Sequence, residues 1–191
     1  MSRAAAIAAA LALGLAAAAL AAGAEAPLPR LGPAPNFALT TQQNDRLWLT
    51  QLRHRVVVLT FTCTACQACP GVLPFLSGLA RDLRDAAGRA VFFVVVTVDP
   101  ARDSAPVLRR FARDRRLDPV AWLLLTGKPS EIDVVTRWYG VAVHRQDGGV
   151  SHDCLVVLID GGGTIRGRYG LDDLAQLRRG VDALRAEGTG S

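Results

Sequence analysis

Three of the four cysteines in this 191-residue chain, Cys63, Cys66 and Cys69, fall within a single short stretch, and Cys154 lies far downstream. A deprotonated cysteine is both the nucleophile of disulfide exchange and a soft metal ligand. A disulfide stabilises a fold most when it closes a long loop, and a link within residues 63–69 would close almost none. The crowding therefore indicates a role in disulfide exchange or metal binding more than a stabilising disulfide.

The spacing Cys-x-x-Cys-x-x-Cys is open to several interpretations. An iron–sulfur site would need a fourth ligand, which is missing at the usual place. A structural zinc site would also need a fourth ligand, which His152 or Cys154 could supply. Copper binding and dithiol chemistry remain, and the position of the cysteines alone does not separate them.

The elements beside the cysteines follow from hydrophobic periodicity. The β-branched run at residues 56–61 predicts a buried central strand that ends just before Cys63. From Pro70 the period becomes helical, so Cys69 is predicted to cap a helix, where the helix dipole favours a thiolate. The apolar positions of this helix are Val72, Leu76, Leu79 and Leu83.

The rest of the chain alternates strand and helix patterns, without repeats or a second domain. This alternation predicts an α/β sandwich, a central mixed β-sheet flanked by helices. Trp48, Trp122 and Trp138 lie at positions typical of core tryptophans. Strands are expected at 37–40, 46–49, 91–98, 121–125, 155–159 and 165–169, and helices near 104–111, 130–139 and 174–184.

The N-terminal segment has the features of an export signal. Arg3 precedes an apolar, alanine-rich run at residues 4–22, and small residues suited to cleavage follow. The alternative is an uncleaved membrane anchor, because the run approaches the length that spans a bilayer. We therefore expect residues 1–26 to be a signal peptide or anchor, residues 27–191 to form the domain, and the protein to be periplasmic or otherwise extracytoplasmic.

The charge pattern says little about a macromolecular partner. The formal net charge is +5, from 22 basic and 17 acidic residues, and the arginines are scattered among aspartates. A nucleic-acid-binding protein would carry a more concentrated basic surface. Nucleic-acid binding is therefore not indicated.

Several motifs occur in an order that resembles the Sco/SenC family of oxidase-assembly proteins. The strand pattern at residues 56–62 precedes a Cys-x-x-Cys-Pro sequence, and an Asp-Pro-x-Arg-Asp block follows at 99–103. Leu-Thr-Gly-Lys-Pro at 125–129, Trp-Tyr-Gly-Val at 138–141 and Val-Ser-His at 150–152 continue the likeness. The resemblance covers residues 33 to about 184 and implies a thioredoxin-like fold.

The resemblance also implies a metal site. Sco/SenC proteins bind copper through two cysteines and a distant histidine, which correspond here to Cys66, Cys69 and His152. Such a donor set suits Cu(I) and also Cu(II). The family has three residues between its two cysteines, whereas this chain has two, and Ala65 stands where the first ligand is expected. Cys63 is therefore a further candidate ligand.

The function implied by the resemblance is that of a copper metallochaperone for maturation of the cytochrome c oxidase copper centre. Its partner would be the copper-bearing oxidase subunit or another copper carrier. The alternative is an exported thiol:disulfide oxidoreductase of the thioredoxin or TlpA type, with Cys66 and Cys69 as the redox pair. A thioredoxin has a cis-proline near position 154, whereas this chain has no proline after Pro129. A binding protein is therefore favoured over an enzyme.

The segment around Cys154 completes the predicted site. If a strand already begins at His152, then His152 and Cys154 share one face. In a thioredoxin-like fold this stretch faces the cysteine loop, so we expect Cys154 to lie close to one of the other cysteines. There it would ligate copper or form a long-range disulfide, and a buried free cysteine is the alternative. His54 and His144 are expected to be solvated, and Asp99 to be structural.

Overall fold

The computed structural model describes residues 27–66, 69–146 and 149–188. The predicted signal peptide or anchor at residues 1–26 lies outside the described residues, so that expectation stays a prediction. Across the described ranges, no helix combines the length and the apolar character needed to cross a membrane.

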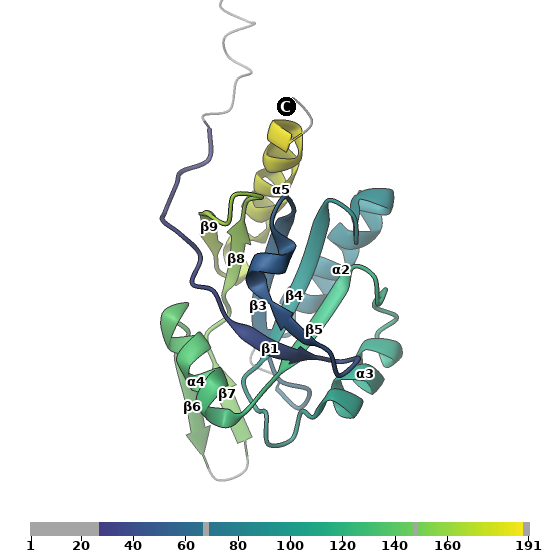
Figure 1. Ribbon diagram of the computed structural model, residues 1–191, viewed down its shortest axis with the longest axis vertical. Coiled ribbons are helices and arrows are strands. Elements are labelled where there is room, and N and C mark those ends of the chain that lie inside the picture. Colours follow the sequence, from purple (N-terminus) through teal and green to yellow (C-terminus); the bar gives the residue numbers. More distant parts are fainter. Residues whose placement is uncertain (1–26, 67–68, 147–148, 189–191) are drawn as a thin grey trace, which may run out of the picture.

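A seven-stranded mixed sheet forms the centre of the fold (Figure 1). Its strand order is β2-β1-β5-β4-β3-β8-β9, with β3, β4 and β5 parallel and the other neighbours antiparallel. The predicted α/β sandwich is therefore confirmed. The strands are β1 (Ala38–Thr41), β2 (Arg46–Trp48), β3 (Val56–Thr62), β4 (Val91–Thr97), β5 (Trp122–Thr126), β8 (Val156–Ile159) and β9 (Ile165–Tyr169).

Helices cover both faces of the sheet. The apolar sides of α2, α3 and α5 pack on one face, while α4, a short 3-10 helix η1 and a separate β6–β7 hairpin cover the other (Figure 1). The helices are η1 (Leu49–Leu52), α2 (Val72–Leu83), η2 (Arg84–Ala86), α3 (Ala105–Asp114), α4 (Pro129–Trp138), η3 (Leu171–Asp173) and α5 (Leu174–Gly188), and the hairpin strands are β6 (Val143–Gln146) and β7 (Gly149–His152).

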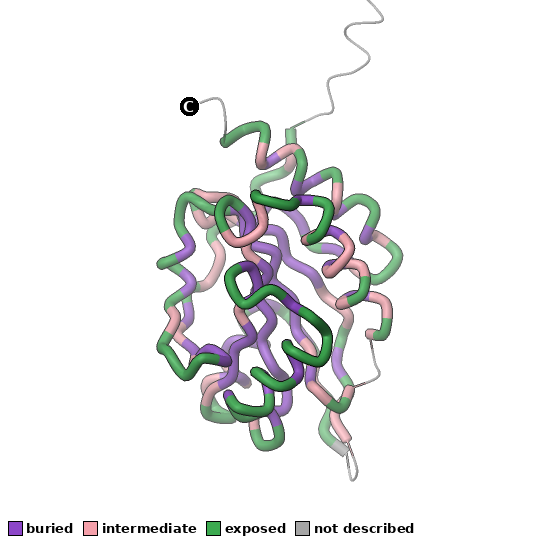
Figure 2. Tube along the Cα trace, turned by 90° about the vertical axis from the view of Figure 1, so that its right-hand side faces the viewer, coloured by how far each residue is buried: buried purple, intermediate pink, exposed green. Residues whose placement is uncertain are grey.

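Strand β3 is buried on both of its faces. Val56 and Val58 point into the core beneath α2 and α5, whereas Val57 and Leu59 point into the core beneath α4. A strand covered on both sides is apolar along its whole length, which explains the unbroken β-branched run in the sequence. Figure 2 shows the strands buried in the middle of the molecule, between outer surfaces that are largely exposed.

The prediction that all three tryptophans are in the core was wrong for two of them. Trp122 is 2 % exposed and stacks on Phe93, but Trp48 and Trp138 are each 51 % exposed. Trp48 ends the short edge strand β2, where the neighbouring Leu47 takes the inward direction. Trp138 is the last residue of α4. Edge strands and helix ends leave a residue without a covering neighbour, which periodicity alone does not reveal.

Two buried polar side chains fasten the proline-rich lead-in to the domain. The Arg166 side chain, 4 % exposed, donates to the carbonyls of Leu28 and Pro29 and forms ion pairs with Asp160 and Glu187. Burial raises the pKa of Tyr139, so its hydroxyl stays protonated and donates to the Pro35 carbonyl at 2.8 Å. The lead-in is thus held by hydrogen bonds to its backbone carbonyls, in an extended form that proline favours.

Replacing Arg166 tests this anchor. We expect Arg166→Met to lower the free energy of unfolding by roughly 3 kcal/mol, because it leaves two carboxylates and two carbonyls without their cation. Arg178→Ala is the matched control, since the ion pair of Arg178 with Asp82 is exposed and should contribute less than about 1 kcal/mol. Urea denaturation of both variants decides the matter, and equal losses would contradict the proposed anchor.

Candidate functional site

The cysteine loop begins where β3 ends. Cys63 follows the last residue of that strand, is 4 % exposed and forms a disulfide with Cys66, with their Cα atoms 5.0 Å apart. A backbone hydrogen bond from the Cys66 N–H to the Cys63 carbonyl closes the same turn. The structure therefore pairs Cys66 with Cys63, and not with Cys69, the partner expected in the oxidoreductase alternative.

Cys69 forms the second disulfide, with Cys154, and their Cα atoms are 5.5 Å apart. The expectation that Cys154 lies beside another cysteine is thereby confirmed. Two details of the prediction were wrong. Cys69 does not cap α2, because the N-cap is Gly71 and Cys69 only accepts a hydrogen bond from the Val72 N–H. Cys154 lies between β7 and β8 and not on a strand.

The two disulfides lie against opposite faces of the sheet. Cys63 and Cys66 pack with the apolar cluster beneath α4 and the β6–β7 hairpin. Cys69 and Cys154 pack with the cluster beneath α2 and α5. The two pairs are therefore on opposite sides of the sheet, at the end of β3.

His152 is the last residue of β7 and is buried, with 7 % of its surface exposed. Its Nδ1 lies 2.9 Å from the Asp153 carbonyl oxygen, which can only accept, so Nδ1 carries the proton. In this tautomer Nε2 carries the lone pair. This buried atom has no hydrogen-bond partner among the described residues. A lone pair held in this way is what a metal ion requires of a histidine ligand.

A contact of Cys66 places that sulfur beside the strand of His152. The Sγ atom of Cys66 lies 3.4 Å from the carbonyl oxygen of Val150, two residues before His152. In β7, residues two apart share a face, and both Val150 and Val143, the cross-strand partner of His152, pack with the cluster that includes Cys66. The segment 150–154 therefore has Cys66 beside its first residue and Cys69 bonded to its last.

No group of three or more His, Cys, Asp or Glu side chains within the described ranges is arranged to hold a metal ion. All four cysteines belong to these ranges, and each is in a disulfide. Metal binding requires thiolates, and a disulfide sulfur is not one. In the oxidised protein His152 is therefore available as a metal ligand, whereas the cysteine sulfurs are not. His54 and His144 are exposed, as expected for solvated histidines.

Asp103 is a positioning residue that the sequence analysis missed. It is fully buried, and its carboxylate accepts hydrogen bonds from the Thr64 N–H at 3.0 Å, from the Thr64 hydroxyl, and from the Thr97 hydroxyl at 2.5 Å. Thr64 lies between the two cysteines of the first disulfide, so Asp103 ties the loop to the end of β4. In the same Asp-Pro-x-Arg-Asp block, Asp99 forms an ion pair with Arg102, consistent with the structural role expected for it.

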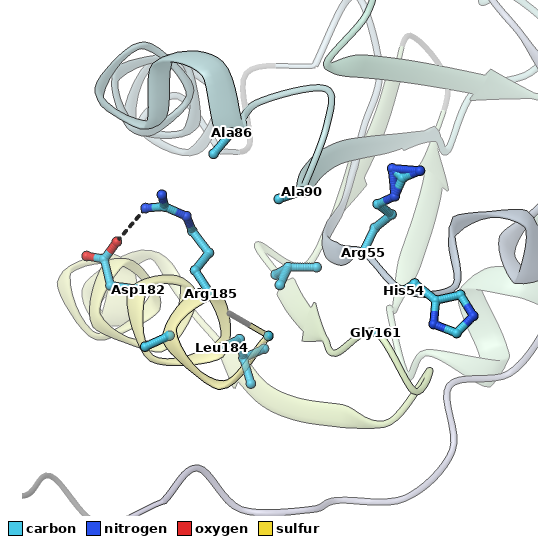
Figure 3. A pocket seen from close by; sticks show the side chains of 11 residues that line it. His54, Arg55, Ala86, Ala90, Gly161, Asp182, Leu184 and Arg185 are labelled. Atoms are coloured by element: carbon cyan, nitrogen blue, oxygen red, sulfur yellow. Dashed lines mark ion pairs between the residues drawn. The ribbon is translucent and has the colours of Figure 1, made fainter. Parts of the chain in front are cut away.

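A hollow of about 480 Å³ lies at the other end of β3 (Figure 3). His54, Arg55 and Arg185 line it together with small apolar residues, and Arg185 forms an ion pair with Asp182. Its lining includes Val56, the first residue of β3, whereas the cysteine loop follows the last. The hollow is therefore separate from the cysteine site.

The fold and the site define a thioredoxin-like domain with a cysteine loop after its central strand and a buried histidine before the closing strands. Over residues 29–183 the sequence matches the SCO1/SenC family, and the chain belongs to that family. The resemblance drawn from the motifs is thereby confirmed.

Individual relatives agree with this assignment. A candidate copper-binding protein of Stutzerimonas stutzeri is 29 % identical over 147 residues, which cover 73 % of this chain and 70 % of that protein. The crystal structure of a SCO1/SenC family lipoprotein from Bacillus anthracis aligns with a TM-score of 0.74 at 25 % identity, covering 84 % of this chain and 99 % of that chain. Arabidopsis thaliana ScoI, solved with copper bound, aligns with a TM-score of 0.68 at 26 % identity over 80 % of this chain and 98 % of that chain.

Removing the Asp103 carboxylate should loosen the cysteine loop. We expect Asp103→Ala to lower the free energy of unfolding by roughly 3 kcal/mol, because three donors lose a charged acceptor in a buried place. Asp133→Ala is the control, since its ion pair with Arg145 is about half exposed and should contribute less than about 1 kcal/mol. Urea denaturation of the oxidised proteins measures both values, and similar losses would contradict the role given to Asp103.

The two disulfides should differ in what they add to stability. Cys69 and Cys154 are 85 residues apart in sequence, whereas Cys63 and Cys66 are 3 apart. We expect Cys154→Ser to lower the free energy of unfolding of the oxidised protein by about 2–4 kcal/mol, and Cys63→Ser to lower it by less, because a longer closed loop restricts the unfolded chain more. With reductant present, the difference between Cys154→Ser and wild type should largely disappear in the same assay. A larger loss from Cys63→Ser would contradict the expectation.

Proposed function

We propose that the reduced protein binds copper through Cys66, Cys69 and His152. The observation that carries this proposal is the buried His152 Nε2, which has no hydrogen-bond partner among the described residues. The copper-bound ScoI structure and the copper-binding description of the Stutzerimonas relative support the choice of metal. Two thiolates and an imidazole form a donor set that suits Cu(I) and, in a suitable geometry, Cu(II).

The contacts of the loop favour Cys66 over Cys63 as the first sulfur ligand. Cys66 is partly exposed and lies against Val150, on the strand that ends in His152. Cys63 is buried in the core at the end of β3. The shorter spacing between Cys66 and Cys69, with two intervening residues, then has to be accommodated by the loop itself. Cys63 and Cys154 are the cysteines left outside this donor set.

The finer function that we propose is metallation of the cytochrome c oxidase copper centre. The copper would be cargo, passed to the copper-bearing oxidase subunit or received from another copper carrier. Family membership supports an assembly role, and a mature protein outside the cytoplasm would have access to such a partner. In this proposal the protein is a metallochaperone, and tethering through the N-terminal segment would place it at the membrane.

A second candidate function is thiol:disulfide exchange, favoured by the Cys63–Cys66 disulfide. This pair has the two-residue spacing of dithiol oxidoreductases, follows a central strand, and combines one buried and one partly exposed sulfur. The redox pair of this alternative would therefore be Cys63 and Cys66, in place of Cys66 and Cys69. An insulin-reduction assay on wild type and Cys66→Ser would measure this activity directly.

Copper retention tests the main proposal. We expect the fully reduced protein to retain one equivalent of Cu(I), and His152→Ala to bind it at least about 10-fold more weakly, because losing a ligand should cost no less than losing its supporting partner. His144→Ala is the control, an exposed histidine on the neighbouring strand. Competition with a chromogenic Cu(I) chelator measures the affinities. Copper retained equally by oxidised and reduced wild type, or equal affinities of the two histidine variants, would contradict the proposal.

A further inference from the structure

Each sulfur of the proposed donor set is bonded to a cysteine outside that set. Cys66 is joined to Cys63, and Cys69 is joined to Cys154. The two candidate ligand sulfurs are therefore kept from binding copper by two different disulfide bonds. A single bond between the two ligands would release both at once on reduction, whereas here each bond releases only one.

The two bonds are structurally independent. The Cys63–Cys66 pair packs with the core beneath α4, and the Cys69–Cys154 pair packs with the core beneath α2 and α5. The first closes a turn at the end of β3, and the second joins the segment before α2 to the segment before β8. Reduction of one bond does not itself break the other, because the two bonds share no sulfur atom.

We propose that the two disulfides are separate redox latches, and that Cys63 and Cys154 act as latch residues which hold one metal-binding thiol each. Copper loading then requires both bonds to be reduced, so four electrons are needed for each copper bound. This inference rests on the proposed function for the identity of the ligand thiols.

The co-reactant that we propose is a dithiol, in the cell a reduced Cys-x-x-Cys protein. One thiolate of the dithiol attacks the Sγ of Cys66, which is partly exposed, and the buried Cys63 sulfur leaves as a thiolate and takes up a proton. The second thiol of the dithiol then attacks its own mixed disulfide and releases Cys66. The dithiol leaves as a disulfide after giving up two electrons and two protons. A second dithiol reduces the Cys69–Cys154 bond in the same way.

Intermediates with one remaining disulfide should not bind copper through the full donor set. A freed Cys66 thiolate can attack the Sγ of Cys69, which forms a Cys66–Cys69 bond and releases Cys154, but this step consumes both ligands. Among the pairings of four cysteines into one disulfide, only a Cys63–Cys154 bond would leave both ligands free. Cys63 is buried in the core at the end of β3, on the face opposite to Cys154, whereas Cys66 and Cys69 are partly exposed and belong to one loop. A Cys63–Cys154 bond is therefore disfavoured relative to a Cys66–Cys69 bond.

Copper loading releases protons from the two ligand cysteines only. When Cu(I) binds, Cys66 and Cys69 each lose a thiol proton, and His152 coordinates through Nε2 while Nδ1 keeps its hydrogen bond to the Asp153 carbonyl. Cys63 and Cys154 keep their protons, because neither is a ligand. Removing both latch residues should therefore leave the copper affinity intact while it lowers the amount of reductant required.

The test counts thiols and copper on the same molecules. Full-length mature protein is reduced anaerobically with increasing dithiothreitol, the reductant is removed by gel filtration, and Cu(I) is added from a chromogenic chelator. Native mass spectrometry then reports copper on species with zero, two and four thiols. We expect wild type to hold copper only in the four-thiol species.

Three variants provide the matched comparisons. Cys63→Ser and Cys154→Ser each lack one latch, so each should load fully after one equivalent of dithiothreitol, whereas wild type needs two. The double variant Cys63→Ser/Cys154→Ser, once fully reduced, should bind Cu(I) within about threefold of wild type. A loss of tenfold or more in the double variant would overturn the latch assignment, because one of the two residues would then be a ligand.

The remaining outcomes separate the latches from the proposed function. Copper bound by two-thiol wild type as tightly as by the four-thiol form would overturn the latches and leave the copper site standing. Failure of the four-thiol form to bind copper would overturn the proposed function and with it the latches. A non-reducing peptide map checks the pairing without metal, and a Cys66–Cys69 link in the oxidised protein would contradict the latches alone.

Discussion

The antiparallel register between β3 and β8 is the constraint on which the site depends. Val57 pairs with Ile159, and Thr60 pairs with Val156, where the Thr60 hydroxyl also donates to the Leu155 carbonyl. Because the strands run in opposite directions, the chain that leaves β3 runs alongside the chain that enters β8. The cysteine loop is therefore brought level with the segment that holds His152 and Cys154. A slip of one residue would turn each of these side chains to the other face.

This constraint explains what the sequence could and could not predict. The strands and helices were foreseen because their apolar periods are dictated by local geometry, as in the unbroken run of β3 and the helical spacing of α2. The proximity of Cys154 to the loop was foreseen only through the family resemblance, since no local pattern encodes the β3–β8 register. The disulfide partner of Cys154 was not foreseen, because nothing in the sequence distinguishes Cys63, Cys66 and Cys69 as partners. The choice among them depends on which face of the sheet each sulfur meets.

The features that were missed share one physical cause. Asp103 was not recognised because a buried carboxylate is identified by its donors, and two of these come from Thr64, on a distant segment. The β6–β7 hairpin was not foreseen because it stands outside the main sheet and carries polar residues. Trp48 and Trp138 were misplaced because exposure at an edge strand or a helix end is set by what lies next to it. In each case the decisive contact is tertiary.

The two disulfides also differ in what the fold loses when they are reduced. Opening Cys63–Cys66 removes a link across one turn, whereas opening Cys69–Cys154 removes a link between two distant parts of the chain. Copper held by Cys69 and His152 would join the same two parts again, since His152 is two residues from Cys154. The closed loop would have nearly the same length, so the metal would restore most of the restriction on the unfolded chain that the disulfide had supplied. Reduction and metal binding would then exchange one long-range crosslink for another, and the apo, reduced protein would be the form in which this part of the fold is held least firmly.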